Sequence, residues 1–489
     1  MLPFKTLIKI DRKSKLPVYQ QIANGFIGLI REGVLKPGLP LPGSRVLADQ
    51  LQLHRNTVVA AYAELTSQDW VVAVARKGVM VAANLPLIKP RSFKTTTSSY
   101  AQGPGFHFNT IPFPAMTSLQ PLKAGQLVIN DGFPDVRLAP LDAWGKECRS
   151  IIENPRQHKQ LMYGEAQGSE KLRHEMIKYL TNTRGLDITI DNIMITRGAQ
   201  MAIYTAAAML IQKGDYIIVG SPNYIFANLC FEQLGARLLH VPVDGDGIDV
   251  AAIEQLCRTR KIRMLYVVPH HHHPTTVTLS SERRMKLLAV IRKYQLAVIE
   301  DDYDYDFHYS SAPILPLASA DHGGNVIYIG SLTKSLGLSL RIGFMIAPVS
   351  FIAEAGRRRR LMDLRGDNLS EEGLAAMLAN GIIERHLKKS KKIYRERRDL
   401  LCHLLEVKLG DLVQFTPPSG GMALWLQFTG NASLPAIAAK AATQGLLMSS
   451  GSNYHYIAKP QHAMRFGFAS LNEKELTAVV TILTKIMKR

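Results

Sequence analysis

The chain is 489 residues long, which is enough for two or more domains, and its 46% hydrophobic and 20% charged residues are an ordinary globular mixture. Lysine and arginine outnumber the acids by 59 to 40, so the formal charge of +19 favours an anionic partner. The four cysteines form no CxxC pair and no apolar run reaches the roughly 18 residues of a membrane span. We therefore expect a cytoplasmic protein without a disulfide framework, a signal peptide or a membrane partner.

The first 82 residues contain patterns of short helices. Residues 16–30, LPVYQQIANGFIGLI, have apolar side chains at helical spacing, and this helix should end near Gly33. A second helix should begin after Ser44, which has the side chain of an N-cap, and should carry Val46, Leu47 and Leu51. A third should begin near Arg55. Two short helices joined by a tight turn predict a helix-turn-helix, in which the later helix presents its first polar residues to base edges.

The residues that follow, 70–83, read WVVAVARKGVMVAA, two β-branched runs around a basic tip, and this pattern predicts a hairpin. Residues 1–82 hold eleven Lys or Arg against five Asp or Glu, an excess of the kind that neutralises phosphates. The alternative is a small helical packing domain with a solvated basic face.

Residues 17–81 resemble the winged helix-turn-helix of GntR-family bacterial regulators through the KPG turn and the motifs LPGSR, RNTV and KGVMV. The resemblance implies a DNA-binding domain over residues 1–82. The side chains that it assigns to phosphates, base edges or the wing are Arg45, Arg55, Asn56, Thr57, Arg76 and Lys77. The family usually has serine where this chain has His54, and because imidazole is a poorer N-cap, we expect a looser entry to the recognition helix.

Residues 83–122 are expected to be a linker, because much of the stretch is rich in Pro, Ser and Thr and has no sustained period of 2 or 3.6. From residue 123 to 489, helical patterns alternate with β-branched runs. Such alternation predicts an α/β domain with a mostly parallel sheet and ligands at the carboxyl ends of the strands. From about residue 357, long basic helices and later strand patterns predict a smaller C-terminal α+β subdomain.

Residues 325–343, NVIYIGSLTKSLGLSLRIG, form the stretch with the strongest chemical signal. A buried strand should end at Gly330, close to Ser331, Lys334 and Arg341. Partial burial and nearby cations lower the pKa of a lysine amine and make it a Schiff-base nucleophile, while hydroxyls and a guanidinium suit a phosphate. A lone lysine in a loop is most often a solvated charge, so the assignment depends on the rest of the domain.

This stretch resembles the lysine segment of fold-type I pyridoxal-phosphate enzymes, and residues 123–489 as a whole resemble class I/II aminotransferases. The motifs that carry the resemblance are YGEAQGSEKLR at 163–173, ITRGAQMAI at 195–203, SPNYIFA at 221–227, VIEDDYDYDF at 298–307 and MRFGFA at 464–469. The resemblance implies that pyridoxal 5'-phosphate is held by Lys334 as a Schiff base.

The resemblance also assigns residues to the cofactor's ring. Asp301 would keep the pyridine nitrogen protonated, which makes the ring an electron sink. Tyr303 would hydrogen-bond the 3-oxygen, with His273 beside it, and Tyr224 would stack on the ring.

A phosphate site would lie at the start of a helix, where free N–H groups and the helix dipole suit an anion. The residues implied for it are Gly198, Ala199, Gln200, Ser331 and Arg341, together with Tyr163 from the neighbouring subunit. Arg465 matches the arginine that binds a substrate carboxylate, and its alternative role is a structural ion pair.

The segment PHHHHPTT, residues 269–276, invites a metal interpretation. Extended residues alternate between two faces and helical histidine ligands usually lie four apart, so we expect no metal site. The corresponding family pattern resembles PSHQYPTG, and Thr276 therefore stands where the family has glycine.

A winged helix joined by a linker to an aminotransferase-like domain is similar to the MocR subgroup of GntR regulators. The resemblance implies a homodimeric, pyridoxal-phosphate-dependent transcriptional regulator of bacterial type that binds double-stranded DNA with repeated half-sites. Its signal would be an amine, an amino acid or the cofactor. One alternative is an active aminotransferase, because every residue needed for the half-reaction is present. Another is a DNA-binding protein whose large domain serves only for dimerisation.

Overall fold

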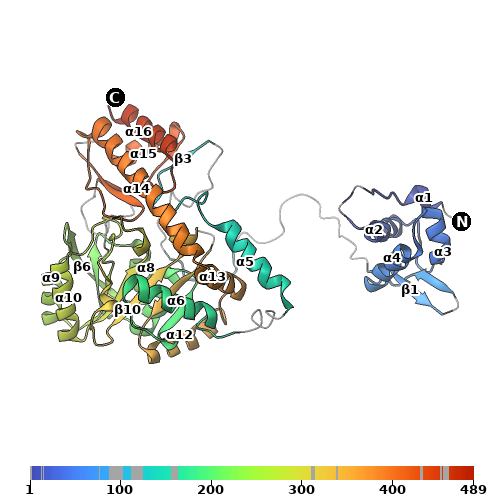
Figure 1. The fold of residues 1–489 in the computed structure, drawn as a ribbon, viewed down its shortest axis with the longest axis horizontal. Helices are drawn as coiled ribbons and strands as arrows, with labels where there is room; N and C mark the ends of the chain where they lie inside the picture. The colour runs from blue at the N-terminus through green and yellow to red at the C-terminus, as the bar shows by residue number, and fades with distance from the viewer. Residues whose placement is uncertain are drawn as a thin grey trace. The chain divides into compact units, whose positions relative to one another are not determined.

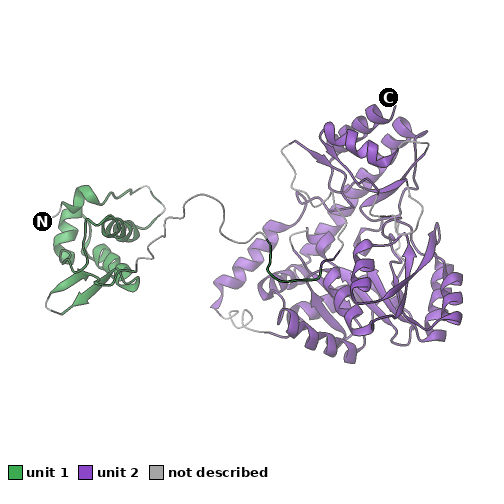
Figure 2. Cartoon of the chain, turned by 180° about the vertical axis from the view of Figure 1, so that it is seen from behind, with its two compact units in different colours: residues 1–109 green, residues 110–489 purple. Residues whose placement is uncertain are grey.

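The computed structural model describes most of the chain as two compact units, residues 1–109 and 110–489, and they divide within the stretch expected to be a linker (Figure 2). The described residues are 3–12, 14, 16–75, 77–86, 103–111, 125–155, 164–309, 314–337, 340–429, 433–451, 454 and 462–488. Among them, no helix is both long enough and apolar enough to cross a membrane.

The first unit is a set of short helices followed by a two-stranded hairpin (Figure 1). Its elements are α1 (Phe4–Leu7), α2 (Val18–Arg31), α3 (Ser44–Leu51), α4 (Arg55–Ser67), β1 (Val71–Val74) and β2 (Gly78–Val81). The strands are antiparallel, with Val71 opposite Val81 and Val74 opposite Gly78. This is the predicted winged helix-turn-helix architecture.

The core of the first unit forms where the apolar stripes of α2 and α4 meet. Phe26 and Tyr62 are buried with ring centroids 5.9 Å apart, and the Tyr62 hydroxyl donates to the Pro42 carbonyl at 2.6 Å. One detail of the prediction is wrong, because α3 begins at Ser44 and its N-cap is Gly43. Val46, Leu47 and Leu51 lie on this helix as predicted; Leu47 and Leu51 are buried and Val46 is exposed.

The second unit is built on an eight-stranded sheet in which the strands that carry the site are parallel. In spatial order its strands are β4 (Ile193–Thr196), β11 (Gly343–Ile346), β10 (Val326–Ser331), β9 (Ala297–Asp302), β8 (Ile262–Val267), β5 (Tyr216–Ser221), β6 (Arg237–Asp244) and β7 (Gly247–Ile248). Strand β11 runs antiparallel to both of its neighbours, and β7 runs antiparallel to β6.

Helices cover both faces of this sheet. Successive residues of a strand point to opposite sides, so a strand with consecutive apolar residues needs a packed layer on each face. Ile217 and Val219 of β5 pack in a cluster with α7, α8 and α12, whereas Ile218 packs in another with α9 and α10. The helices of the second unit that precede α14 in the chain are α5 (Leu141–Glu153), α6 (Glu170–Arg184), α7 (Ala199–Leu210), α8 (Ile225–Gln233), α9 (Val250–Thr259), α10 (Ser281–Tyr294), α11 (Thr333–Leu336), α12 (Val349–Met362) and α13 (Asn368–Ala379). Short 3-10 turns are η3 (Ile190–Asn192), η4 (Tyr305–Phe307) and η5 (Leu317–Ser319).

The long helix α14 (Ile382–Leu409) leads from the sheet region into a smaller α+β part (Figure 1). That part contains α15 (Leu434–Thr443), α16 (Glu473–Met487) and a three-stranded antiparallel sheet of β12 (Val413–Gln414), β13 (Ala423–Phe428) and β15 (Ala463–Gly467). Strand β3 (Leu127–Val128) pairs with β14 (Leu446–Leu447), so the start of the domain is tied to its end.

Candidate functional sites

The helical residues predicted to contact DNA in the first unit lie at the starts of α3 and α4. Arg55 and Asn56 are exposed at the first turn of α4, Thr57 is half-buried, and Arg45 is exposed on α3. The Arg55 guanidinium donates from Nε to the Ser44 hydroxyl at 3.3 Å, so Ser44 joins α3 to α4 instead of capping α3.

The looser start expected for α4, with His54 in place of a serine N-cap, is not found in the structure. The imidazole of His54 accepts a hydrogen bond at Nδ1 from the Asn56 backbone N–H at 3.3 Å, which satisfies one of the free donors of the helix. The hairpin turns at Gly78, whose φ of +85° favours glycine, and places the exposed Lys77 at its tip. Arg76 lies outside the described residues.

The second unit contains a cavity of about 220 Å³ where the parallel strands end. Strands β5, β8, β9 and β10 are neighbours in the sheet, so their carboxyl ends bring together segments that are distant in sequence. The cavity is lined by Asp131, Phe133, Ala199, Gln200, Tyr224, Phe226, His273, Asp301, Tyr303, Ser331, Thr333, Lys334 and Arg341. Most of the residues that the sequence singled out therefore surround one space.

Lys334 lies on the short helix α11 directly after β10. Its Nζ donates to the Gly132 carbonyl at 2.6 Å and lies 4.9 Å from the centroid of the Phe133 ring. Burial, reinforced by Arg465 and Arg341, lowers the pKa of Lys334 from its ordinary 10.5 to about 8. The neutral, nucleophilic form of this amine is therefore far more populated near neutral pH than that of an ordinary lysine.

Asp301 also lines this cavity. It lies within β9, whose last three residues are the acids Glu300, Asp301 and Asp302, and not in a loop after the strand. Its Oδ2 accepts from the Tyr266 hydroxyl at 2.7 Å, whereas its buried Oδ1 has no hydrogen-bond partner among the described residues. Burial raises the pKa of Asp301 to about 7. A buried acceptor left over at a cavity wall fits a ligand that brings its own N–H or cation.

The opposite end of the cavity suits an anion. Gly198 caps α7 with a φ of +81°, and a Cβ there would come within 2.9 Å of the Arg341 guanidinium. Ala199 and Gln200 form the first turn of α7, whose free N–H groups favour negative charge. The buried Thr333 hydroxyl oxygen has no partner among the described residues.

Arg465 on β15 is fully buried next to the cavity and is not one of its lining residues. It donates from a terminal guanidinium nitrogen to the Tyr303 hydroxyl at 2.9 Å and from Nε to the Asp131 carbonyl at 3.0 Å. Burial alone would raise the pKa of Asp131, yet His273 and Arg465 bring it down to about 2. Both the ion pair and the position beside the cavity are thus present.

The four consecutive histidines are all buried, and each contacts a different group. The ring of His270 contacts the Ile314 carbonyl, and that of His271 contacts the Asp304 carboxylate. The ring of His272 contacts the Thr275 hydroxyl, and that of His273 contacts the Asp131 carboxylate. Among the residues that the structure describes, no group of three or more His, Cys, Asp or Glu side chains could hold a metal ion. Thr276 has a φ of +63°, the conformation for which the glycine of the resembling pattern is suited.

Sequence patterns missed several cavity residues, namely Asp131, Phe133, Phe226, Thr333 and the neighbouring Tyr454, whose hydroxyl donates to Asp131 at 2.9 Å. Phe226 and Thr333 lie inside motifs already noted, SPNYIFA and SLTK, so their proximity to Tyr224 and Lys334 was the available signal. The predicted Tyr163 lies outside the described residues.

Comparison with known proteins identifies the large unit. The profile of the family described as "Aminotransferase class I and II" matches residues 130–483. The chain belongs to this family. A second profile, "Bacterial regulatory proteins, gntR family", matches residues 18–81. The prediction of a gntR-type winged helix-turn-helix fused to an aminotransferase-like domain is therefore confirmed.

Relatives with both parts share almost the whole length of this aminotransferase-family chain. The uncharacterised HTH-type transcriptional regulator YisV of Bacillus subtilis is 28% identical over 95% of this chain and 95% of its own. The probable rhizopine catabolism regulatory protein MocR of Rhizobium meliloti is 25% identical over 96% and 94%. The predicted MocR-type organisation is thus found in curated relatives.

Among solved structures, an archaeal alanine:glyoxylate aminotransferase superposes with a TM-score of 0.70 and 30% identity, over 75% of this chain and 91% of that one. The fold prediction for the large unit is confirmed. Pyridoxal phosphate is the cofactor that this fold family implies. Its ring nitrogen fits the Asp301 oxygen that has no partner among the described residues, its phosphate fits the glycine at the start of α7, and its aldehyde fits the Lys334 amine.

Proposed function

We propose that this chain is a pyridoxal-phosphate-dependent, homodimeric transcriptional regulator that binds operator DNA and senses an amine, an amino acid or the cofactor itself. The observation that carries the proposal is that one chain holds two kinds of site. Exposed Arg55 and Asn56 begin a recognition helix, and Lys334 lines the same cavity as Asp301, one of whose carboxylate oxygens has no partner among the described residues.

In this proposal the cavity residues divide the cofactor between them. When bound, pyridoxal phosphate supplies an aldehyde for the Lys334 amine and an electron-withdrawing ring. Asp301 holds a proton on the ring nitrogen, Tyr224 covers the ring, and Tyr303 and His273 contact its 3-oxygen. The phosphate is held by the first turn of α7, by Ser331 and, through a charged guanidinium, by Arg341.

Arg465 would bind the carboxylate group of the amino acid that acts as the signal. Three of the five N–H groups of the Arg465 guanidinium donate to the Tyr303 hydroxyl and to the carbonyls of Asp131 and Pro274, and the Asp131 carboxylate lies 3.7 Å from Nε, so a bound carboxylate would compete with Asp131 for this cation. A carboxylate-bearing amine would then change the positions of Tyr303 and of the segment around Asp131, and a regulator responds when a ligand prefers one of two such arrangements.

The surface of the large unit supports a homodimer. Leu361, Met362 and Leu364 are exposed near the end of α12, with 90% of Leu361 accessible. Adjacent exposed apolar side chains are typical of protein contact sites. The resemblance to aminotransferases assigns Tyr163 of one subunit to the cofactor of the other, and a two-fold dimer would require a repeated operator.

A second candidate function is catalytic transamination. A largely buried lysine with a pKa near 8 can take and return a proton near neutral pH, as an aminotransferase requires. This observation makes turnover a specific alternative rather than a general one.

DNA fragments from the promoter beside the coding sequence would test the regulator. We expect the cofactor-loaded protein to bind one fragment specifically in a mobility-shift assay and to change its affinity when an effective amine or amino acid is added. Unchanged affinity across a panel of amines and amino acids, with and without cofactor, would leave only a DNA-binding scaffold.

Turnover would separate the two candidate functions. The purified protein is incubated with each amino acid and a 2-oxo acid acceptor, and the new amino acid is quantified against the amount of protein. We expect at most one product per cofactor. Many products per cofactor would replace the regulator-only proposal with that of an enzyme carrying a DNA-binding domain.

A further inference from the structure

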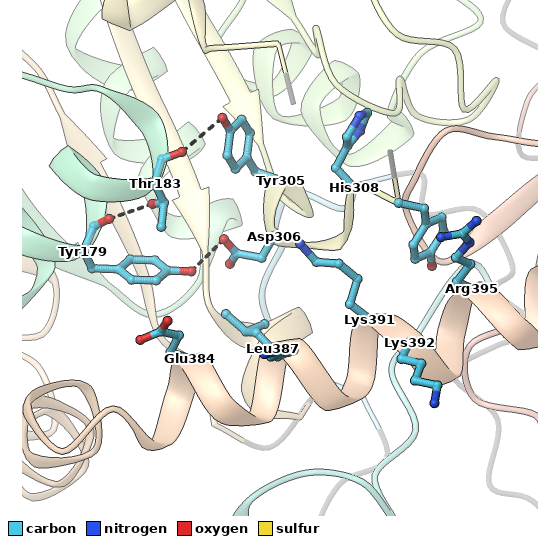
Figure 3. Close-up of a pocket in the computed structure, with 12 residues that line it drawn as sticks. Tyr179, Thr183, Tyr305, Asp306, His308, Glu384, Leu387, Lys391, Lys392 and Arg395 are labelled. Atoms are coloured by element: carbon cyan, nitrogen blue, oxygen red, sulfur yellow. Dashed lines mark hydrogen bonds between the residues drawn. The ribbon is translucent and has the colours of Figure 1, made fainter. Parts of the chain in front are cut away.

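The larger unit contains a second cavity, of about 490 Å³, between α6, the turn η4 and the helix α14 (Figure 3). It shares no lining residue with the cavity around Lys334. The residues that line it are Tyr179, Thr183, Tyr305, Asp306, His308, Tyr309, Glu384, Leu387, Lys388, Lys391, Lys392 and Arg395. Its volume is within the range of pockets that hold small organic molecules.

One wall of this cavity is cationic because of helical spacing. Lys388, Lys391, Lys392 and Arg395 follow one another at intervals of three, one and three residues on α14, so they share a face of the helix. Lys391 is half-buried, and in Figure 3 it extends from α14 towards η4. Within the described residues, no ion pair joins Lys388, Lys391 or Lys392 to a carboxylate.

The acidic groups at this cavity do not neutralise that wall. Asp306 is already paired with the buried Arg184 at 2.9 Å and also accepts from the Tyr179 hydroxyl at 2.6 Å. Glu384 lies one turn before Lys388 on α14 and is exposed. Charge therefore accumulates on the α14 wall, where an anion would be stabilised.

The other walls are aromatic, and their hydroxyl groups are engaged elsewhere. Tyr179 donates to Asp306, Tyr305 to the Thr183 carbonyl at 3.2 Å, and Tyr309 to the Gly421 carbonyl. An arginine guanidinium lies over one face of each ring, Arg184 over Tyr179 and Tyr305 and Arg398 over Tyr309, so each ring has its edge and its other face to offer a ligand. Leu387 adds apolar surface from α14.

A space with ring surfaces on one side and cations on the other suits a flat molecule that carries a negative charge. We propose that the cavity between η4 and α14 is a second ligand site that binds a small aromatic anion, a ring bearing a phosphate or carboxylate group. The ring packs among the tyrosines, and the anionic group lies against Lys388, Lys391 and Arg395.

Two short paths connect this site to the Lys334 cavity. Asp306 accepts from the Ser335 hydroxyl at 3.3 Å, and Ser335 follows Lys334 in the chain. His308 at the cavity wall contacts the His271 ring at 3.4 Å, and the His271 carbonyl accepts from the Tyr303 hydroxyl at 2.8 Å. A ligand that moves η4 or His308 is therefore coupled to cofactor binding, a step that rests on the proposed cofactor.

Isothermal titration of the full-length, cofactor-loaded protein tests the site itself. Phenyl phosphate and benzoate represent the two anionic groups, and phenol and inorganic phosphate each lack one half of the ligand. We expect one of the aromatic anions to bind saturably, and both half-ligands to bind about tenfold more weakly or not at all. Absence of saturable binding by phenyl phosphate and by benzoate overturns the proposal.

Lysine variants locate the binding. Lys388→Gln with Lys391→Gln should weaken the aromatic anion about tenfold, because both charges lie on the cavity face. Lys389→Gln is the matched control, since Lys389 is exposed on the same turn of α14 but does not line the cavity. Equal losses in the two proteins would mean general attraction to a basic helix and would overturn the site.

The coupling has its own readout. Because coupling between two ligands is reciprocal, phenyl phosphate should change the affinity for pyridoxal phosphate by about fivefold or more. Ser335→Ala should reduce that change while retaining the binding of phenyl phosphate. If the anion binds but cofactor affinity stays constant, the coupling is wrong; if the anion binds protein that takes up no pyridoxal phosphate, the cofactor proposal fails and the second site stands.

Discussion

The exposed start of α4 and the buried cavity around Lys334 are built in opposite ways. Arg55, in the first turn of α4, keeps its side chain exposed and donates a hydrogen bond to Ser44 of the neighbouring helix. At the cavity, Lys334 and the buried Arg465 beside it come from distant parts of the sequence and donate to adjacent backbone carbonyls, those of Gly132 and Asp131, and Arg465 is also paired with the Asp131 carboxylate.

The difference decides how each site should respond to change. Exposed groups that share no partners contribute nearly independently, whereas buried groups in one network are coupled, so a single substitution disturbs several. The first site should therefore lose affinity stepwise, and the second should lose function abruptly.

The largest expected effect is that of Lys334→Ala. Lys334 is the only amine among the described residues that line the cavity, so its removal abolishes covalent attachment of pyridoxal phosphate, seen as loss of the protein-bound absorbance, and abolishes the response to amines. Basal DNA affinity should stay within about twofold, since the two sites share no partners. Lys474→Ala, at an exposed position of α16, is the control and should resemble the wild type. Retained response to amines in Lys334→Ala would contradict the sensor role.

A stepwise loss is expected at the recognition helix. Arg45→Ala and Arg55→Ala should each weaken operator binding about tenfold, additively, and each should lower the salt dependence of the affinity by about one ion. Anisotropy titrations at several salt concentrations measure both quantities. Arg31→Ala removes an exposed charge at the end of α2 and serves as the control. Equal weakening by all three substitutions would mean that net charge, not this surface, binds DNA.

The buried carboxylate gives the large unit a pH dependence. Because burial raises the pKa of Asp301 from 3.8 to about 7, the folded protein binds this proton more tightly than the unfolded chain. The resulting stability is present below pH 4 and is lost as the pH rises towards 7. Relative to Asp301→Asn, cofactor-free wild type should therefore lose on the order of 2 kcal/mol of unfolding free energy between pH 5 and 7.

Urea denaturation at both pH values measures this difference. The control is Asp321→Asn, because the Asp321 side chain is 82% exposed and should leave the pH dependence unchanged. If Asp301→Asn and the wild type change in parallel, Asp301 is ionised in the folded protein across this range and the predicted proton uptake is wrong.

Features that depend on residues close together in the sequence could be predicted, whereas contacts between distant segments could not. The short helices, the hairpin and the residues after each strand were predictable, because periodicity and turn residues act locally. Asp131 and Tyr454 were not, because their contact with each other and with Arg465 arises only when β15 of the smaller α+β part packs near the start of the domain. The cavity beneath α14 was missed for a related reason, since the spacing of its lysines is visible but the tyrosines opposite them are not adjacent in sequence.

The smallest effect concerns the rigidity of the DNA-binding unit. Gly28 lies inside α2 and a Cβ there would meet nothing within 4 Å, so Gly28→Ala should stabilise the unit by about 0.7 kcal/mol through lower entropy of the unfolded chain. Gly33 also has open space, but its φ is +77°, and Gly33→Ala should destabilise by about 1 kcal/mol. Hydrogen exchange of the α2 amides measures both. Because the two substitutions add the same methyl group to unobstructed positions, opposite signs would identify backbone conformation as the cause, whereas equal signs would show that the positive φ at Gly33 does not decide the effect.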